Sequence, residues 1–270
     1  MSCSNAAIDF CEVMMSDEIL VEVVDGVQII RINRPDKKNA LTVDMYAAMN
    51  DALKNGDASD DIAVHLLTGT DGMFSAGNDL KEFIAFATGG DEKLEGYEFL
   101  KTIAQIKKPL IAAVDGLAVG IGTTMLLHCD LVYASSQATF STPFVNLGMV
   151  PEGGSSLLVP RMMGASRAFE LLCLGQVFSA EKAHGAGLVN EVVASDELVD
   201  YAVQCGRLLA SKPPEALAMS REMIKGSPQD ILDCMEAEIK VFTNRLVSDE
   251  AREAFSAFFE KRPPNFSRKG

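Results

Sequence analysis

The 270-residue sequence contains no run of 18 or more apolar residues, so no segment is predicted to cross a membrane as a helix. The stretch from Met1 to Met15 carries Asp9 and Glu12 but no lysine or arginine, which excludes the basic start of a secretory signal. The end of the chain, Ser267–Gly270, is not a peroxisomal address of the Ser-Lys-Leu type. We therefore expect a cytoplasmic protein, in which residues 1–17 form a disordered extension.

Paired cysteines and clustered histidines are also missing. None of the six cysteines forms a Cys-x-x-Cys pair, and their wide spacing indicates free thiols in a reducing compartment. The three histidines show no metal-ligand spacing, so no metal site is predicted. These residues are Cys3, Cys11, Cys129, Cys173, Cys205, Cys234, His65, His128 and His184.

Basic residues and nucleotide-binding signatures are scarce. The 24 lysines and arginines stand against 38 aspartates and glutamates, which gives a formal net charge of −14. Since nucleic acid binds basic faces, this balance argues against a nucleic-acid partner. Gly116–Gly122 does not match G-x-G-x-x-G, no P-loop occurs, and Ser155 does not stand in a G-x-S-x-G motif. The sequence therefore predicts no nucleotide cofactor and no serine-hydrolase elbow.

An alternation of buried strands and helices is present instead, up to about Val193. Apolar and β-branched runs predict the strands, and apolar spacing with a cap at Thr42 predicts the first helix. This alternation favours an α/β fold. The expected strands are Val27–Asn33, Ala63–Thr68, Leu110–Val114 and Asp130–Ala134, and further helices are expected from Lys81 to Lys107, interrupted near Gly89, and from Gly120.

The pattern becomes almost entirely helical from Asp196 to Lys261. Pro213, Pro214 and Pro228 interrupt it and mark breaks between helices. We expect a core formed by residues 18–195 and a C-terminal helical segment formed by residues 196–270.

Two glycine-rich turns, around Ala76–Gly77 and Gly120–Gly122, each lead from a strand into a helix. Such turns aim unpaired backbone amides and the positive end of a helix dipole at a ligand. Two of them could converge on one oxygen atom and form an oxyanion hole. Ordinary packing at a helix entry is the competing interpretation, and the residues alone leave both open.

Six motifs, taken together, resemble the crotonase (enoyl-CoA hydratase/isomerase) superfamily in order and spacing. The resemblance covers residues 18–265 and implies an α/β spiral of ββα turns, followed by a helical trimerisation segment. It also implies acyl-CoA thioesters as substrates and self-association as a homotrimer or a dimer of trimers. The motifs are Arg34–Leu41 (RPDKKNAL), Phe74–Leu80 (FSAGNDL), Asp115–Gly122 (DGLAVGIG), Cys129–Ala134 (CDLVYA), Pro151–Gly154 (PEGG) and Phe178–Asn190.

The resemblance further implies a set of site residues. The backbone amides of Ala76 and Ile121 would form the oxyanion hole for the thioester carbonyl. Other residues would contact the substrate or its CoA part, although the lysines among them could equally be solvated surface side chains. The expected contact residues are Lys37, Lys38, Ser75, Gly77, Asn78, Lys81, Gly120, Phe144 and Lys261.

The carboxylates favour an isomerase over a hydratase. Hydratases of this superfamily use two glutamates, and the matching positions here are Thr124 and Phe144. Glu152 matches the single catalytic glutamate of the peroxisomal type of Δ3,Δ2-enoyl-CoA isomerase. One base can move a proton from C2 to C4 of a planar dienolate, and this needs no metal or redox cofactor. A hydratase, a dienoyl-CoA isomerase and a non-catalytic CoA-ester binding protein are the alternatives; acyl chain length would depend on residues 82–100.

Overall fold

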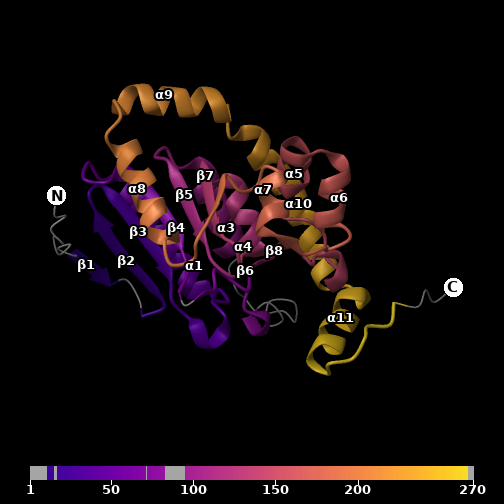
Figure 1. The fold of residues 1–270 in the computed structure, drawn as a ribbon. Helices are drawn as coiled ribbons and strands as arrows, with labels where there is room; N and C mark the ends of the chain where they lie inside the picture. The colour runs from indigo at the N-terminus through magenta and orange to yellow at the C-terminus, as the bar shows by residue number, and fades with distance from the viewer. Residues whose placement is uncertain (1–10, 15–16, 71, 83–94, 267–270) are drawn as a thin grey trace.

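Seven strands form the central sheet of the computed structural model, which describes residues 11–14, 17–70, 72–82 and 95–266 (Figure 1). The strand order is β1-β2-β3-β4-β5-β7-β10. β1, β2 and β3 pair antiparallel, and β3, β4, β5, β7 and β10 pair parallel. Their bounds are β1 Cys11–Met14, β2 Ile19–Val24, β3 Val27–Ile32, β4 Val64–Thr68, β5 Leu110–Val114, β7 Leu131–Ser135 and β10 Glu191–Val193.

The middle strands of the parallel part, β4 and β5, are buried on both faces, which explains why they are mostly apolar. All five residues of β4 and of β5 are buried. Leu66 packs in the cluster under helix α8 (Leu198–Ala210), whereas its neighbour Leu67 packs in the main core with α1 (Val43–Ala58). The prediction of an α/β fold with helices at its C-terminus is confirmed.

A smaller sheet, in the order β6-β8-β9, stands beside the large one. β6 and β8 pair parallel, and β8 and β9 pair antiparallel. The turn between β6 and the short helix α4 is the second of the two glycine-rich turns. The bounds are β6 Leu117–Val119, β8 Thr139–Ser141, β9 Phe178–Ser179, α3 Glu95–Gln105, α4 Ile121–Thr124, α5 Ser155–Met163, α6 Ala165–Leu172 and α7 Ala180–Gly185.

The predicted strands agree with β3, β4, β5 and β7 to within a residue, and Thr42 caps α1 as expected, accepting from the Met45 amide at 3.3 Å. β2 was not predicted. The helix expected from Lys81 to Lys107 is present as α3 over its last part, whereas the expected break near Gly89 lies outside the described residues.

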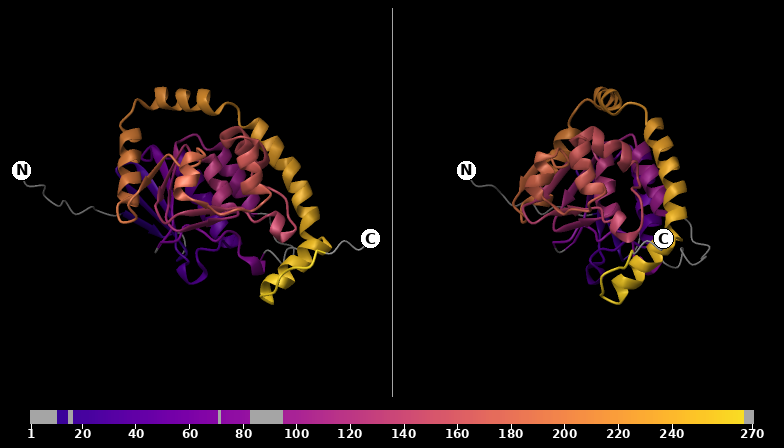
Figure 2. Two further views of the ribbon diagram at one scale, coloured as in Figure 1. Left: turned by 45° about the vertical axis from the view of Figure 1, so that its right-hand side comes forward. Right: turned by 90° about the vertical axis from the view of Figure 1, so that its right-hand side faces the viewer.

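Four helices follow β10 in the described part of the chain, and the prolines separate the first three of them as predicted. α8 covers one face of the large sheet, α9 (Pro214–Lys225) arches away from the body of the molecule, and α10 (Gln229–Leu246) returns along its other side (Figure 2). α11 (Asp249–Phe259) completes the described chain. A domain boundary at residue 195 stays a prediction. In the described ranges no helix has both the length and the apolar character that a membrane crossing requires.

Candidate active site

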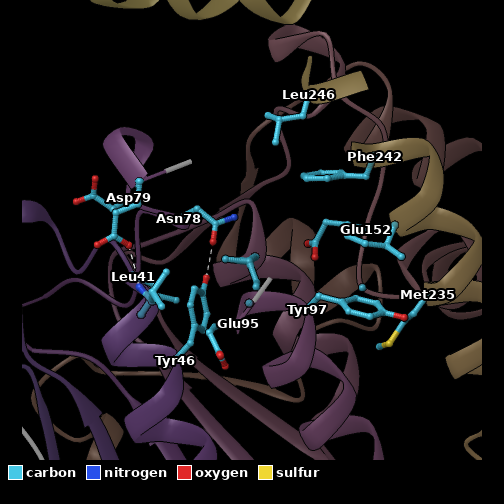
Figure 3. Close-up of a pocket in the computed structure, with 16 residues that line it drawn as sticks. Leu41, Tyr46, Asn78, Asp79, Glu95, Tyr97, Glu152, Met235, Phe242 and Leu246 are labelled. Atoms are coloured by element: carbon cyan, nitrogen blue, oxygen red, sulfur yellow. Dashed lines mark hydrogen bonds between the residues drawn. The ribbon is translucent and has the colours of Figure 1, made fainter. Parts of the chain in front are cut away.

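A pocket lies between α1, the start of α3, the first residue of α4 and one face of α10 (Figure 3). Segments far apart in the sequence contribute to it: Asn78 follows the first glycine-rich turn, Ile121 begins α4, and Glu152 precedes α5. The structure therefore brings together three residues that the sequence analysis singled out. An apolar stripe on α10 closes one side of the pocket, formed by Met235, Ile239, Phe242 and Leu246.

Glu152 presents a buried carboxylate to this pocket. Its residue is only 9% exposed, and in Figure 3 its carboxylate points into the open space. The Thr124 hydroxyl donates to Glu152 Oε1 at 2.5 Å. Burial raises the pKa of Glu152 from 4.5 to about 7, the Thr124 hydrogen bond opposes this shift, and the nearby charge of Glu238 adds to it. A carboxylate with such a pKa is a stronger base than an exposed one.

The turn after Glu152 is held from outside by side chains that the sequence analysis did not identify. Gly153 and Gly154 have φ values of 71° and 74°, which favour glycine. The Gly153 carbonyl lies 2.8 Å from His128 Nε2, and burial lowers the pKa of His128 to about 4, so the ring is neutral and donates from this nitrogen. Glu238, on α10, accepts from the Gly154 amide at 2.6 Å. Side-chain hydrogen bonds thus hold the two residues that follow Glu152.

The first glycine-rich turn presents Asn78, rather than Ala76, to the pocket. Leu41 donates to the Gly77 carbonyl and accepts from the Asp79 amide, both at 2.8 Å, so the Asn78 amide points away from Leu41. Among the described residues, neither the Asn78 amide nor the Ile121 amide has a hydrogen-bond acceptor. Both residues line the pocket. Two unpaired N–H groups of the backbone are therefore available beside Glu152.

The expectation that the Ala76 amide faces the substrate is wrong for this structure. The Ala76 amide donates to the Lys38 carbonyl at 3.0 Å, so it is already satisfied, and Ala76 does not line the pocket. The Ala76 amide faces Lys38, whereas beyond Gly77, which has a φ of 87°, the Asn78 amide points away from Leu41, so the assignment depends on the register of this segment against residues 38–41. The sequence motif alone could not show that register.

Tyr46 fixes the side chain of Asn78. The Tyr46 hydroxyl donates to Asn78 Oδ1 at 2.6 Å, which leaves the amide nitrogen directed toward the pocket (Figure 3). Burial, together with the charges of Glu152 and Glu82, holds the pKa of Tyr46 well above its usual value, so the hydroxyl stays protonated and donates. Tyr46 was missed because it lies on the apolar face of α1, where an aromatic residue is typical of ordinary core.

Ser75, Gly77 and Gly120 shape the turns and do not line the pocket. The Ser75 hydroxyl is buried, donates to the Asn39 carbonyl at 2.9 Å and accepts from the Gly77 amide at 3.1 Å. Gly77 has a φ of 87°, and a Cβ there would lie 2.6 Å from the Val119 carbonyl oxygen. Gly120 has a φ of 57° at the entrance of α4. Each therefore shapes the pocket only through the geometry of the backbone.

Phe144, which the sequence analysis expected to contact the substrate, does not form a wall of this pocket. Its side chain is buried in the main hydrophobic core, and it is absent from the lining of this pocket. The apolar stripe of α10 supplies that wall instead. The sequence could not locate it, because the stripe begins more than 80 residues after Glu152 and only the fold brings the two together.

The predicted lysines lie on the surface. The Lys38 backbone contacts Ala76, and Lys81 lies two residues after Asp79, so both are near the Leu41 side of the pocket. Lys37 is exposed and pairs with Asp36 at 3.6 Å. Lys261 is exposed and follows α11, where its amide donates to Phe258. Their contact with CoA stays a prediction.

Comparisons of this chain with known proteins, by sequence and by structure, agree with one another. A family model described as enoyl-CoA hydratase/isomerase matches residues 22–269. Enoyl-CoA delta isomerase 2 of Rattus norvegicus is 38% identical over 255 residues; these cover 92% of this chain but only 65% of that relative's length. The 1,2-epoxyphenylacetyl-CoA isomerase of Escherichia coli (strain K12) is 35% identical over 264 residues, covering 94% of this chain and all of that relative.

A solved structure with a similar fold is an enoyl-CoA hydratase/isomerase from Pseudoalteromonas atlantica T6c. It superimposes with a TM-score of 0.88 at 39% identity and covers 93% of this chain and 100% of that one.

Proposed function

Because this chain belongs to the enoyl-CoA hydratase/isomerase family, we propose that it acts on acyl-CoA thioesters as a Δ3,Δ2-enoyl-CoA isomerase of fatty-acid β-oxidation. The observation that carries the proposal is Glu152: one buried carboxylate with a raised pKa, at the pocket, hydrogen-bonded to Thr124. Thr124 and Phe144 stand where, by the family resemblance, the hydratases have their two glutamates. Among the described residues, the site therefore has a base for proton transfer but no partner to activate water.

The proposed reaction begins with binding of the 3-enoyl thioester, its carbonyl oxygen at the amides of Asn78 and Ile121. Glu152 removes a proton from C2, and the electron pair moves through the carbonyl to give a dienolate. Two amide donors stabilise the negative oxygen, each worth about 3–4 kcal/mol when it is well placed. The protonated Glu152 then returns the proton to C4, which leaves the double bond between C2 and C3 and restores the carboxylate.

Among the described residues, the other carboxylates near the pocket do not supply the missing partner. Glu82 accepts from the Val43 amide at 2.8 Å and so caps α1, and Asp79 pairs with Arg34 at 2.8 Å. The Glu95 carboxylate points away from Glu152 in Figure 3. Glu238 is bonded to the turn before α5 and does not line the pocket. This arrangement disfavours both a hydratase and a two-carboxylate dienoyl-CoA isomerase.

The proposal is tested by supplying the protein with a 3-enoyl-CoA and, in a separate reaction, with the 2-enoyl-CoA of the same chain length. We expect the first to gain the absorbance of the conjugated thioester and the second to lose none of it by hydration. Hydration of the 2-enoyl-CoA at a rate equal to or above isomerisation would overturn the proposal. No turnover of either would favour a binding role.

We also propose that the chain self-associates, as the family resemblance implies. No residue of α9 is buried, and Met219, Met223 and Ile224 on it are 61%, 86% and 85% exposed. Apolar surface of this kind is typical of a contact with another protein chain. Light scattering after size exclusion measures the mass: three or six chains support the proposal, and a monomer contradicts it.

A further inference from the structure

Glu238 is a buried carboxylate that contacts the turn after Glu152 through three hydrogen bonds. It is 8% exposed. It accepts from the Gly154 amide at 2.6 Å, from the Ser156 amide at 2.9 Å and from the Ser156 hydroxyl at 2.5 Å. The two amides belong to the N-terminal end of α5, where backbone donors lack helical partners and a negative charge is favoured. One side chain of α10 thus accepts hydrogen bonds from the backbone donors of the segment that begins two residues after Glu152.

The helix that carries Glu238 also forms the wall of the pocket. Met235, Ile239 and Phe242 line the pocket from positions three residues before, one after and four after Glu238. These spacings place them on neighbouring faces of the same helix. Among the described residues, Glu238 is the buried charged side chain of α10 that bonds to this turn, so it links the apolar wall to the segment that follows Glu152.

The charge of Glu238 is balanced by these donors, because among the described residues no lysine or arginine forms an ion pair with it. The ionisable groups that face this region are Glu152 itself, Cys234 on α10, His128 and Tyr46, and the pocket is also lined by Asp79, Glu82, Glu95 and Tyr97. Cys234 Sγ lies 3.6 Å from Glu238 Oε1, and burial raises the pKa of this thiol, so it stays protonated. His128 is neutral, and Tyr46 is protonated. Beside burial, which is the larger cause, the negative charge of Glu238 raises the pKa of Glu152.

We infer that Glu238 is a positioning residue for the reaction: it holds the turn that carries Glu152 against the apolar wall of α10, and its charge strengthens Glu152 as a base. This inference rests on the proposed function, in which Glu152 takes the proton. Glu238 itself touches no substrate, since it lies outside the pocket lining. Its effect is expected on the rate of proton transfer and on the pH profile, and much less on KM.

The test compares Glu238→Gln with Glu236→Gln. Both remove one negative charge from α10, but Glu236 is exposed and pairs with Lys240 at 2.8 Å. For Glu238→Gln we expect kcat to fall about tenfold, with KM nearly unchanged, because the turn is less firmly placed. We expect the acidic limb of the pH profile to move down by about half a pH unit, because a like charge is gone. Glu236→Gln should match the wild type in all three quantities.

A second variant separates geometry from charge. Ser156→Ala removes one donor to Glu238 and keeps its charge, so a smaller fall in kcat with an unmoved acidic limb is expected. It also provides a test if Glu238→Gln does not fold. If folded Glu238→Gln keeps the wild-type kcat and acidic limb, the inference is wrong and Glu238 only joins two helices. If Glu238→Gln does not fold, Ser156→Ala with a wild-type kcat contradicts the inference.

A measurement without substrate distinguishes this inference from the proposed function. Carboxyl-labelled glutamate allows the ionisation of Glu152 to be followed by 13C NMR, with the Glu152→Gln protein to assign its signal. If the midpoint moves down in Glu238→Gln, Glu238 acts on Glu152 even where no isomerase activity is found. If the midpoint does not move in an active protein, Glu238 does not act on Glu152 through its charge. The inference as stated is then contradicted, whereas the proposed function is not.

Discussion

Thr124 donates a 2.5 Å hydrogen bond to Oε1 of Glu152, from the position at which the family resemblance implies a carboxylate in the hydratases. The two residues lie on separate elements, the last residue of α4 and the turn before α5, and they meet at the pocket. The bond occupies one oxygen of the carboxylate and leaves Oε2 as the atom that can take a proton. The Thr124 hydroxyl thus orients the base. A carboxylate at this position could instead take part in proton transfer itself.

Replacing Thr124 by valine should weaken the enzyme without enlarging the site. Valine has the shape of threonine but no donor, and a hydrogen bond to a charged group contributes about 1.5–3 kcal/mol. We expect kcat to fall by about tenfold to a hundredfold. Since the bond lowers the pKa of Glu152, its loss should move the acidic limb to higher pH. Thr124→Ser, which keeps the hydroxyl, is the matched control; equal kinetics of the valine and serine variants would contradict this role.

The raised pKa of Glu152 also predicts how stability varies with pH. The folded protein holds the Glu152 proton up to about pH 7, whereas the unfolded chain releases it near 4.5. Between these values the folded state binds more protons, so the free energy of unfolding falls as pH rises and then levels off. A shift of this size corresponds to about 3 kcal/mol.

Glu152→Gln removes this penalty and should be more stable than the wild type at pH 8 but not at pH 4.5. Urea unfolding of the two proteins at both pH values measures the difference. A wild type that is as stable as the variant at pH 8 would show that Glu152 ionises in the folded state at its ordinary pKa.

Backbone esters test which amide serves the thioester oxygen. Replacing residue 78 by its α-hydroxy acid removes only the N–H group, and we expect kcat to fall about a hundredfold to a thousandfold. The same change at residue 76 breaks only the bond to the Lys38 carbonyl, so it should cost about 1 kcal/mol of stability and leave kcat nearly intact. If the ester at Ala76 is the damaging one, the structural assignment is wrong and the assignment from the motif is right.

Tyr46→Phe should affect substrate binding and turnover modestly. The variant keeps the aromatic ring in the core but loses the hydroxyl that holds Asn78 Oδ1. With the Asn78 side chain free to turn, we expect kcat/KM to fall about threefold to tenfold, in line with the loss of one buried hydrogen bond. Kinetics of Tyr46→Phe beside Tyr97→Phe, which alters a pocket tyrosine without such a bond to Asn78, check this; identical losses in both would argue against it.

The central strands and the place of Glu152 in a glycine turn could be predicted from the sequence, for a physical reason, and its role as the base stays a prediction. Buried parallel strands need continuous apolar runs, so Leu110–Val114 could be located to the residue. Glu152 lies in a glycine turn whose letters are local, and its neighbours Gly153 and Gly154 need positive φ. Such features depend on only a few adjacent residues, so the sequence alone indicates them.

The contacts made across the fold could not be predicted in this way. In the sequence, Glu238 and the apolar stripe of α10 are typical of an ordinary amphipathic helix. Only the folded structure shows that they contact the start of α5 and the pocket. Tyr46 is indistinguishable in sequence from a core aromatic, and the choice between Ala76 and Asn78 depends on the register of a bridge to Leu41. These errors share one cause: each depends on pairing between segments at least 32 residues apart, such as Tyr46 and Asn78.

The most direct test of the account is turnover of a 3-enoyl-CoA to the 2-enoyl-CoA by Glu152→Gln beside the wild type. The amide keeps the size of the side chain and its contact with Thr124 but cannot take a proton. The account predicts that kcat falls by at least about a thousandfold while the substrate still binds. A Glu152→Gln protein that turns over the 3-enoyl-CoA as fast as the wild type would contradict it, because the base would then have to be another group.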